Sequence, residues 1–144
     1  DHTSIIDMKC NMFDIIFLTD SGDIYRGDGG SFTKIERTFI NPKIFIDTSH
    51  CYILHDVLDK KYITTIYQNY VTGDELDFNV ETLIVGYYTM FYICKDSVYC
   101  KGSNIYYNLG LGHKDPVNEP ILHPFLSGKN LLGFPNRNNV KRAN

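Results

Sequence analysis

A weak threefold repeat is the feature of this sequence that most constrains its fold. Three segments align by eye: residues 9–25 (KCNMFDIIFLTDSGDIY), 45–63 (FIDTSHCYILHDVLDKKYI) and 84–99 (IVGYYTMFYICKDSVY). Each is predicted to form an apolar strand, a short turn, a second strand ending at Leu18, Leu54 or Ile93, a charged turn and a third strand. Short strands joined by close turns indicate a β-meander rather than alternating strands and helices.

The turns of the three segments support this alignment. Asn11, Asp47 and Gly86 each stand seven positions before the end of the second strand. All three residue types tolerate a left-handed backbone, so we expect the same positive-φ corner in each repeat. Residues 20–23 (DSGD) are a good hairpin turn, and residues 95–97 (KDS) fill the same role one residue shorter.

The composition favours sheets along the whole chain. Its 11 Tyr and 9 Phe, with frequent Ile and Val, suit the half-buried surfaces of strands. No stretch has the length and period of a strong helix, and four prolines interrupt longer patterns: Pro42, Pro116, Pro120 and Pro124. A chain of 144 residues with 43% hydrophobic side chains is long enough to bury a core. The sequence therefore predicts an all-β fold.

The most specific motif begins in the last strand of the third repeat. Residues 98–104 (VYCKGSN), Tyr106, residues 109–112 (LGLG) and Pro120 resemble the repeat of the regulator of chromosome condensation family. The family pattern is Val-Tyr-x-Trp-Gly-x-Asn, then Tyr-Gly-Gln-Leu-Gly-x-Gly, then a variable loop and Pro. The resemblance implies a β-propeller in which these residues form the structural repeat motif: Gly86, Gly102, Asn104, Leu109, Gly110, Gly112 and Pro120.

Departures from the family pattern indicate degenerate repeats. Lys101 replaces the usual Trp. His50 lies where the family commonly keeps a His before its second strand, but Asp14 and Thr89 occupy that place in the other two repeats. The first two repeats also keep only fragments of the glycine and asparagine motif.

The glycines of the motif raise the alternative of a phosphate-binding loop. Anion sites of the P-loop and dinucleotide types need a helix N-terminus after the glycines, and no strand-to-helix transition follows Gly102, Gly110 or Gly112. At the inner edge of a propeller, in contrast, backbones approach closely and corners require conformations that a Cβ disfavours. We therefore predict a scaffold role for these glycines.

Three repeats are too few to close a propeller, which needs about 4 to 8 blades. We predict a partial β-propeller of about three meander blades in residues 1–134. The expected divisions are repeats at 5–40, 41–81 and 82–120, the start of a fourth repeat at 121–134, and a polar basic tail at 135–144. The chain is then either a piece of a longer propeller or an open stack whose exposed edges a partner covers.

The sequence offers little for catalysis, cofactors or metals. His50 and Cys51 are adjacent, so within one strand they point to opposite faces and cannot share a proton. Cys94 and Cys100 lack the further ligands that zinc needs. We expect the four cysteines to be free buried thiols, and we expect no catalytic, cofactor-binding or metal-binding residue.

Charge and hydropathy limit the partners. The net charge is −3 and the Lys and Arg residues are dispersed, which disfavours nucleic acid as the main partner, the tail excepted. No apolar run approaches about 20 residues, so no membrane span is expected. These features fit a cytoplasmic or nuclear protein.

Tyrosines are the main candidates for a binding surface, because interfaces favour Tyr and Arg. We expect about half of six tyrosines to be core and one member of each adjacent pair, 87–88 and 106–107, to point outward. His55 is expected in the loop after the second strand. The candidate interface residues are Tyr67, Tyr70, Tyr88, Tyr106, Tyr107 and His55, with Arg137, Lys141 and Arg142 of the tail.

The leading hypothesis is a non-catalytic protein-interaction or scaffold module. The main alternative, implied by the resemblance, is guanine-nucleotide exchange on a small Ras-like GTPase such as Ran. That activity needs a full propeller face and an inserted wedge loop, which three degenerate repeats do not supply. A third hypothesis is a lineage-specific subunit of a large ribonucleoprotein complex, anchored by the tail.

Overall fold

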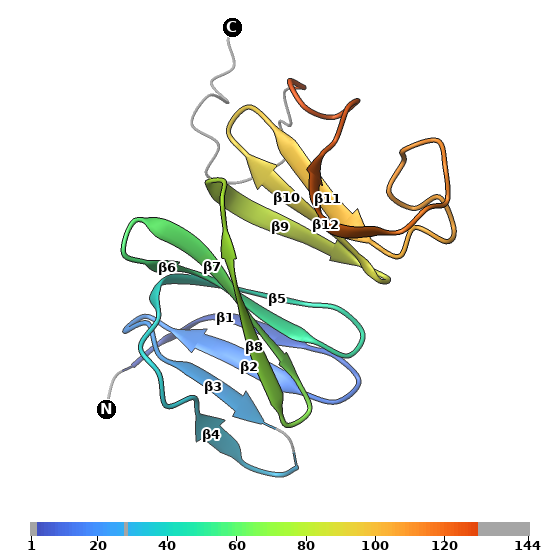
Figure 1. Ribbon diagram of the computed structural model, residues 1–144. Helices are drawn as coiled ribbons and strands as arrows, with labels where there is room; N and C mark the ends of the chain where they lie inside the picture. Colours follow the sequence, from blue (N-terminus) through green and yellow to red (C-terminus); the bar gives the residue numbers. More distant parts are fainter. Residues whose placement is uncertain (1–2, 28, 130–144) are drawn as a thin grey trace, which may run out of the picture. The chain divides into compact units, whose positions relative to one another are not determined.

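The computed structural model describes residues 3–27 and 29–129, and the expectation of an all-β fold is confirmed within them. Twelve strands form three four-stranded antiparallel sheets, and the described residues contain no helix (Figure 1). In each sheet consecutive strands are neighbours, as the meander prediction requires. The chain divides into two compact units, Asp1–Asp77 and Phe78–Asn144, which we describe separately.

The first unit contains two sheets. Sheet 1 consists of β1 (Ile5–Cys10), β2 (Ile15–Thr19), β3 (Ile24–Gly27) and β4 (Phe32–Lys34). Sheet 2 consists of β5 (Ile40–Ile46), β6 (Cys51–Val57), β7 (Lys60–Tyr67) and β8 (Tyr70–Leu76).

The core of the first unit joins these two sheets. Strand β2 alternates, so that Ile16 and Leu18 are buried, and they belong to one hydrophobic cluster with Ile44 and Ile53 of sheet 2. Burying an isoleucine or leucine fully stabilises a fold by about 1.5–3 kcal/mol. This alternation is therefore what holds the first repeat against the second.

The second unit contains sheet 3, made of β9 (Val80–Gly86), β10 (Thr89–Cys94), β11 (Val98–Gly102) and β12 (Val117–Leu122). On one face, Leu109 of the long β11–β12 connection packs in a cluster with Cys100 and Val117. Elsewhere in this unit, the Phe78 ring stacks on the ring of Tyr99 in β11, with ring centroids 3.9 Å apart. The connection that carries the sequence motif is thus part of the core of its own sheet.

The prediction of positive-φ corners at Asn11, Asp47 and Gly86 is wrong, because none of the three residues has that conformation. Asn11 instead caps its turn, its Oδ1 accepting hydrogen bonds from the backbone amides of residues 13 and 14 at 2.9 and 2.8 Å. Asp47 Oδ1 accepts in the same way from residues 49 and 50. At Gly86 a Cβ would come within 2.9 Å of the Thr89 hydroxyl oxygen, so this corner needs a small residue for reasons of space.

The charged turns at the opposite end of the sheets are of unequal length. The hairpin turn at residues 20–23 is confirmed: Gly22 has φ of 88° and donates its amide to the Thr19 carbonyl at 3.0 Å. In the second repeat the strand does not end at Leu54 but continues to Val57, and the turn is Leu58-Asp59 with φ of 58° at Leu58. This extension moves His55 from the predicted loop into β6.

The third sheet extends slightly past its predicted end. Strand β12 runs to Leu122 and includes Pro120. Because β12 is an edge strand, the missing amide of a proline can be tolerated there. Of the expected start of a fourth repeat at 121–134, residues 121 and 122 belong to β12 and residues 130–134 lie outside the described residues, as does the tail at 135–144.

Candidate protein-interaction surface

The two ends of each sheet differ in character. In a meander, the connection of strands one and two and that of strands three and four lie at the same end, which we call the apolar end. These connections and the residues bordering them carry the following exposed side chains: Met12, Phe13, Phe32, Tyr70, Tyr87, Tyr88, Ile105, Tyr106 and Tyr107. The turns between strands two and three carry mainly polar residues, with the exposed Leu58 as an exception: Asp20, Ser21, Asp23, Asp59, Lys95, Asp96 and Ser97.

Asn104 organises the long connection between β11 and β12. It is fully buried, with φ of 57°. Its Nδ2 donates hydrogen bonds to the carbonyl oxygens of His113 and Asp115 at 2.8 and 2.9 Å, and its Oδ1 accepts one from the Leu109 amide at 3.1 Å. One side chain therefore ties the beginning, middle and end of the connection together.

His123, which directly follows β12, holds the same connection in place. Its Nε2 donates to the Leu109 carbonyl oxygen at 2.8 Å, while its Nδ1 accepts from the amides of Phe125 and Leu126. The two amides require an unprotonated Nδ1, which leaves the proton on Nε2. Sequence reasoning missed this residue, because its partner lies 14 positions away on a loop whose path the sequence does not reveal.

Two glycines of the motif have a positive φ, and one of them, Gly102, allows the chain to approach the β9–β10 turn. Gly102 has φ of 152°, and a Cβ there would overlap the Tyr88 carbonyl oxygen, which also accepts the Ser103 amide at 3.0 Å. Gly110, with φ of 70°, donates its amide to the Tyr107 carbonyl oxygen at 3.0 Å. These amides are engaged within the fold rather than directed at a ligand.

The tyrosine surface is the cluster that this scaffold displays on the second unit: Tyr87, Tyr88, Ile105, Tyr106 and Tyr107. All five side chains are more than half exposed. Tyr88 and Tyr107 have positive φ, at 54° and 60°. The rings of Tyr87 and Tyr88 meet edge to face at 4.4 Å, and the Lys114 ammonium lies 5.9 Å from the Tyr107 ring.

The tyrosine hydroxyls of this surface interact with one another. The pKa of the Tyr87 hydroxyl is raised chiefly by the neighbouring Tyr88 hydroxyl, with a smaller contribution from Tyr106. The Tyr87 hydroxyl therefore remains protonated at neutral pH and can donate as well as accept hydrogen bonds. The expectation that one member of each adjacent pair points outward is wrong, because both members of both pairs are exposed.

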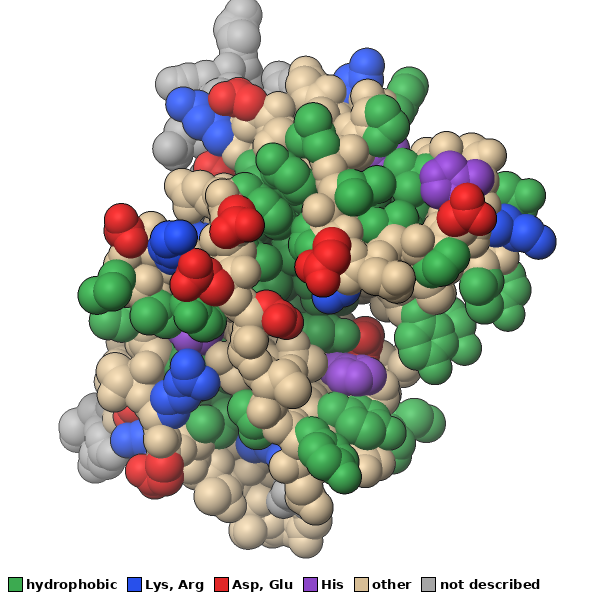
Figure 2. All heavy atoms as spheres, viewed as in Figure 1, with side chains coloured by type: hydrophobic (Ala, Val, Ile, Leu, Met, Phe, Trp, Pro, Cys, Tyr) green, Lys and Arg blue, Asp and Glu red, His purple; other side chains and the backbone are tan. Residues whose placement is uncertain are grey.

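The first unit carries a second group of aromatic residues at its apolar end. Tyr70 is exposed, whereas Tyr67 is half-buried and stacks on the His50 ring at 4.7 Å. The Asn11 Nδ2 donates to the His50 carbonyl oxygen at 3.4 Å, which links the corresponding turns of the two sheets. Figure 2 shows hydrophobic side chains gathered over this end of the first unit.

Other candidates from the sequence do not reach the surface or lie outside the structure. His55 is 2% exposed; its Nε2 lies 2.8 Å from the Thr64 hydroxyl, so it is not available to a partner. The expectation that half of the six tyrosines are core is also wrong, since none of them is buried. The tail residues Arg137, Lys141 and Arg142 lie outside the described residues.

The cysteines differ from expectation at one position. All four are free, but Cys10 is exposed while the other three are buried. Burial and the nearby Asp14 carboxylate raise the pKa of the Cys51 thiol to about 12. Within residues 3–27 and 29–129, no three His, Cys, Asp or Glu side chains are grouped to hold a metal, and no helix could cross a membrane.

Comparison with known proteins identifies the fold but not a family. No protein-family model matches the sequence, and no curated protein matches it. The structure is similar to that of Prp20p from Saccharomyces cerevisiae, with a TM-score of 0.50 and 11% identity over 92% of this chain and 52% of that one. It is also similar to yeast RCC1 (Prp20) bound to Kap60, with a TM-score of 0.50 and 10% identity over 92% and 50% of the two chains.

This likeness confirms the prediction of a partial β-propeller of three meander blades of the RCC1 type. Identity near 10% shows the fold alone. The chain spans about half the length of these propeller chains. The Prp20p study concerns binding to Gsp1p and histones, and the second structure contains Kap60; these interactions belong to the yeast protein.

Proposed function

We propose that this chain is a non-catalytic protein-interaction module that binds a protein partner through the tyrosine surface. The observation that carries the proposal is the exposure of five large side chains, three on the β11–β12 connection that Asn104 and His123 hold in place and two on the neighbouring β9–β10 turn. Binding hot spots are enriched in tyrosine, which offers a large rigid surface with a polar tip at low entropic cost. An immobilised display of this kind suits recognition of a folded or extended polypeptide.

The chemistry of the motif supports binding of a protein rather than of a phosphate. The Asn104 side chain makes three hydrogen bonds inside the connection, and the Gly110 amide is engaged as well. Tyrosine rings and one lysine, in contrast, are the groups offered to solvent. Cys51 is a poor nucleophile with a pKa of about 12, which agrees with a non-catalytic role.

To test this proposal, the proteins that the unmodified chain retains from native extract are compared with those that its variants retain. The triple variant Tyr88→Asn, Tyr106→Ser and Tyr107→Asn removes three exposed rings, and asparagine tolerates the positive φ at positions 88 and 107. Tyr70→Ser is the matched control, since it removes an exposed ring from the other unit. We expect a partner that the unmodified chain and the control retain from native extract and that the triple variant loses.

Identical partner profiles for the triple variant and the unmodified chain would contradict the proposal. Circular dichroism and thermal unfolding of each variant establish that a loss of binding is not a loss of folding. Purification of the retained partner and titration by calorimetry then give the affinity of a defined pair.

Guanine-nucleotide exchange on a small GTPase is the second candidate function. It is favoured by likeness to Prp20p, a protein studied for its binding to Gsp1p. The test measures the rate at which labelled nucleotide is released from a panel of Ras-like GTPases, Ran included. If a saturating concentration of this chain leaves that rate unchanged, the exchange function is excluded. The ribonucleoprotein hypothesis rests on the tail at 135–144, outside the described residues, and is not proposed.

A further inference from the structure

Strand β8 is an edge strand of sheet 2, and no other strand of the described residues pairs with its outer side (Figure 1). It pairs with β7 at all seven of its positions, from Tyr70 to Leu76, with no shift of register. The first six of these residues are exposed. A long, regular edge of this kind presents a row of backbone N–H and C=O groups with which a further strand can pair.

The other five edge strands carry features that hinder such pairing. Register shifts interrupt the ladders of β1, β5, β9 and β12. Strands β5 and β12 also contain prolines, Pro42 and Pro120. Strand β4 has only three residues. Bulges, prolines and short length are common means of protecting a sheet edge, and β8 has none of the three.

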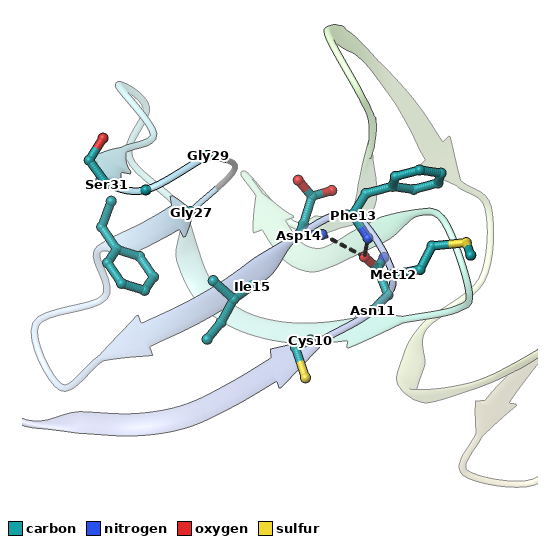
Figure 3. A pocket seen from close by; sticks show the side chains of 11 residues that line it. Cys10, Asn11, Met12, Phe13, Asp14, Ile15, Gly27, Gly29 and Ser31 are labelled. Carbon is teal, nitrogen blue, oxygen red and sulfur yellow. Dashed lines mark hydrogen bonds between the residues drawn. The ribbon is translucent and has the colours of Figure 1, made fainter.

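The outer edge of sheet 1 is short because the chain leaves the ladder there. Only three residue pairs join β3 to β4, beginning with Gly27 and Phe32. Residues 29–31 instead line a hollow of about 450 Å³ together with Cys10 and Ile15 (Figure 3). An added strand would therefore find few partners on the outer edge of sheet 1, in contrast to β8.

The hairpin of β7 and β8 determines which backbone groups of β8 point outward. A two-residue turn closes this hairpin, so Tyr67 and Tyr70 form a pair that exchanges backbone hydrogen bonds. Along an antiparallel ladder, such pairs alternate with pairs that do not bond to each other. Val71, Gly73 and Glu75 therefore direct their N–H and C=O groups away from β7.

Gly73 lies at the centre of this outward row, although the fold does not require a glycine there. It has no positive φ, and nothing lies within 4 Å of the position that its Cβ would take. Glycine weakens the interior of a strand, and one reason for its presence is the close approach of another backbone. A further strand on the outer side of β8 gives this glycine a role.

The surroundings of β8 are acidic, and the strand itself contains no Lys or Arg. The two lysines at the start of β7 are engaged, Lys60 with the Glu75 carboxylate at 3.1 Å and Lys61 with that of Asp56 at 2.6 Å. Three exposed carboxylates near the strand form no ion pair with the described residues: Asp59, Asp74 and Asp77. A positively charged segment is the electrostatic complement of this edge.

We propose that β8 is a docking site for an extended, basic segment of a protein partner, which adds to sheet 2 as a fifth strand. In strand addition, main-chain hydrogen bonds give the affinity and side chains give the specificity. Val71, Gly73 and Glu75 supply the main-chain groups, and the carboxylates select Lys and Arg in the partner. The site belongs to the first unit and shares no residue with the tyrosine surface.

Titration of the full chain with the peptide acetyl-Lys-Thr-Val-Lys-Val-Thr-Lys-amide, followed by NMR, tests the proposal. We expect binding with a dissociation constant below about 1 mM. On saturation, the amides of Val71, Gly73 and Glu75 should exchange with water more slowly, by about threefold or more. The amides of Thr72 and Asp74 are already bonded to β7, so their exchange should change little.

Two variants of the probe separate the sources of affinity. A peptide with every amide nitrogen methylated keeps the charges but cannot donate main-chain hydrogen bonds, and it should not bind. A peptide with Glu in place of each Lys keeps the hydrogen bonds but reverses the charge, and it should bind more weakly than the basic probe by about tenfold or more.

Substitutions in β8 test the same contacts from the side of the protein. Val71→Pro removes one outward N–H and leaves the ladder with β7 intact, so it should raise the dissociation constant of the basic probe by about fivefold. Val71→Thr is the matched control, because it keeps the N–H and a branched side chain, and it should bind as the unmodified chain does. Circular dichroism checks that both variants are folded. If Val71→Pro fails to fold, the methylated probe makes the comparison on the unmodified chain.

Absence of binding up to about 1 mM basic probe overturns the proposal. Equal binding of the methylated probe or of folded Val71→Pro overturns strand addition, and equal binding of the acidic probe overturns the basic partner. The triple variant of the tyrosine surface should bind the basic probe unchanged, which distinguishes failure of this proposal from failure of the proposed function. A dimer of the chain alone that Val71→Pro abolishes would make a second copy the occupant and would also overturn the proposal.

Discussion

The Asp14 Oδ1 accepts a hydrogen bond from Arg26 Nε at 3.0 Å and forms an ion pair with Arg26 Nη2 at 2.9 Å. The Asp14 side chain is 1% exposed and that of Arg26 is 16% exposed. Asp14 also donates its amide to the Asn11 side chain, and its second carboxylate oxygen faces the Cys51 thiol of β6 at 4.0 Å. One buried ion pair thus connects the first turn, strand β3 and the neighbouring sheet.

Removal of the Asp14 charge should destabilise the first unit strongly. Asp14→Asn leaves the mostly enclosed Arg26 guanidinium without a counter-charge, and breaking a buried ion pair costs about 3 kcal/mol or more. Urea unfolding followed by circular dichroism measures the loss. The matched control is Lys60→Gln, which breaks the exposed Lys60–Glu75 pair and should change stability far less. Equal losses of stability in the two variants would show that the Asp14–Arg26 pair contributes no more than an exposed ion pair.

Loss of the Asn104 side chain should loosen the connection that displays the tyrosine surface. Asn104→Gly keeps the positive φ of 57° but removes three hydrogen bonds, each worth about 1 kcal/mol net. We expect a local destabilisation of about 3 kcal/mol, seen as faster hydrogen exchange at residues 104–115. Exchange in sheet 2 serves as the internal control. Unchanged protection of the connection would mean that His123 alone is sufficient to hold it.

Substitution of glycine by alanine should destabilise the fold at Gly102, where a Cβ has no room, but not at Gly73, where the space is open. Gly102→Ala brings a Cβ against the Tyr88 carbonyl oxygen at a φ of 152°, so sheet 3 should lose about 2 kcal/mol or more. Gly73→Ala is the control, because nothing lies within 4 Å of its Cβ position and no positive φ is required. It should be neutral or slightly stabilising. Thermal unfolding of both variants makes the comparison.

His55 should make the fold less stable as the solution becomes acidic. Burial lowers its pKa below the ordinary 6.5, and the nearby Arg37 charge adds to this effect, whereas Asp56 opposes it. The unfolded chain therefore takes up a proton at a higher pH than the folded one does. The stability is fully present above about pH 6.5 and is lost as the pH falls below that value toward the lowered folded pKa.

His55→Gln tests this pH dependence. Glutamine can still accept a hydrogen bond from the Thr64 hydroxyl but does not titrate. The free energy of unfolding of the original chain should fall more between about pH 7.5 and about pH 5.5 than that of the variant. The remaining histidines contribute equally to both proteins, so parallel pH profiles would contradict the assignment.

Asp47 should control stability in a lower pH range. Burial alone would raise its pKa, but hydrogen bonds from the Tyr52 hydroxyl at 2.6 Å and from the amides of Ser49 and His50 hold it below 3.8. Its contribution is therefore present above about pH 3.8 and is lost as the pH falls through the lowered folded pKa. Tyr52→Phe should raise the Asp47 pKa, measured by carboxyl NMR titration, and cost about 1.5 kcal/mol at neutral pH. An unshifted titration curve would place the stabilisation in the backbone amides.

The repeat, the strands and most turns could be predicted because they depend on neighbours in the sequence. Alternation in β2 and the DSGD turn are local patterns that physical rules translate directly. The corners at Asn11 and Asp47 were located correctly but assigned the wrong conformation. Both residue types can either adopt a positive φ or cap a turn with a side-chain oxygen, and the choice depends on the hydrogen bonds that the turn offers.

Burial across sheets could not be predicted in the same way. His55 was expected in a loop because the second strand was predicted to end at Leu54, but the strand continues to Val57 and the His55 ring is enclosed near Thr64 and Phe39. His123 gave no signal, since its partner at Leu109 becomes a neighbour only when the connection folds back. The tyrosine pairs follow neither strand alternation nor burial, because both lie in connections where positive-φ residues turn the chain.

The order of strands in this protein was determined by the spacing of apolar residues and turn formers, which act over a few positions of the chain. The tertiary structure alone decided which side chains are enclosed and which rings are displayed. Those outcomes depend on contacts between residues that are distant in the sequence, and the free energy of such contacts is set by the shape and chemistry of both partners at once.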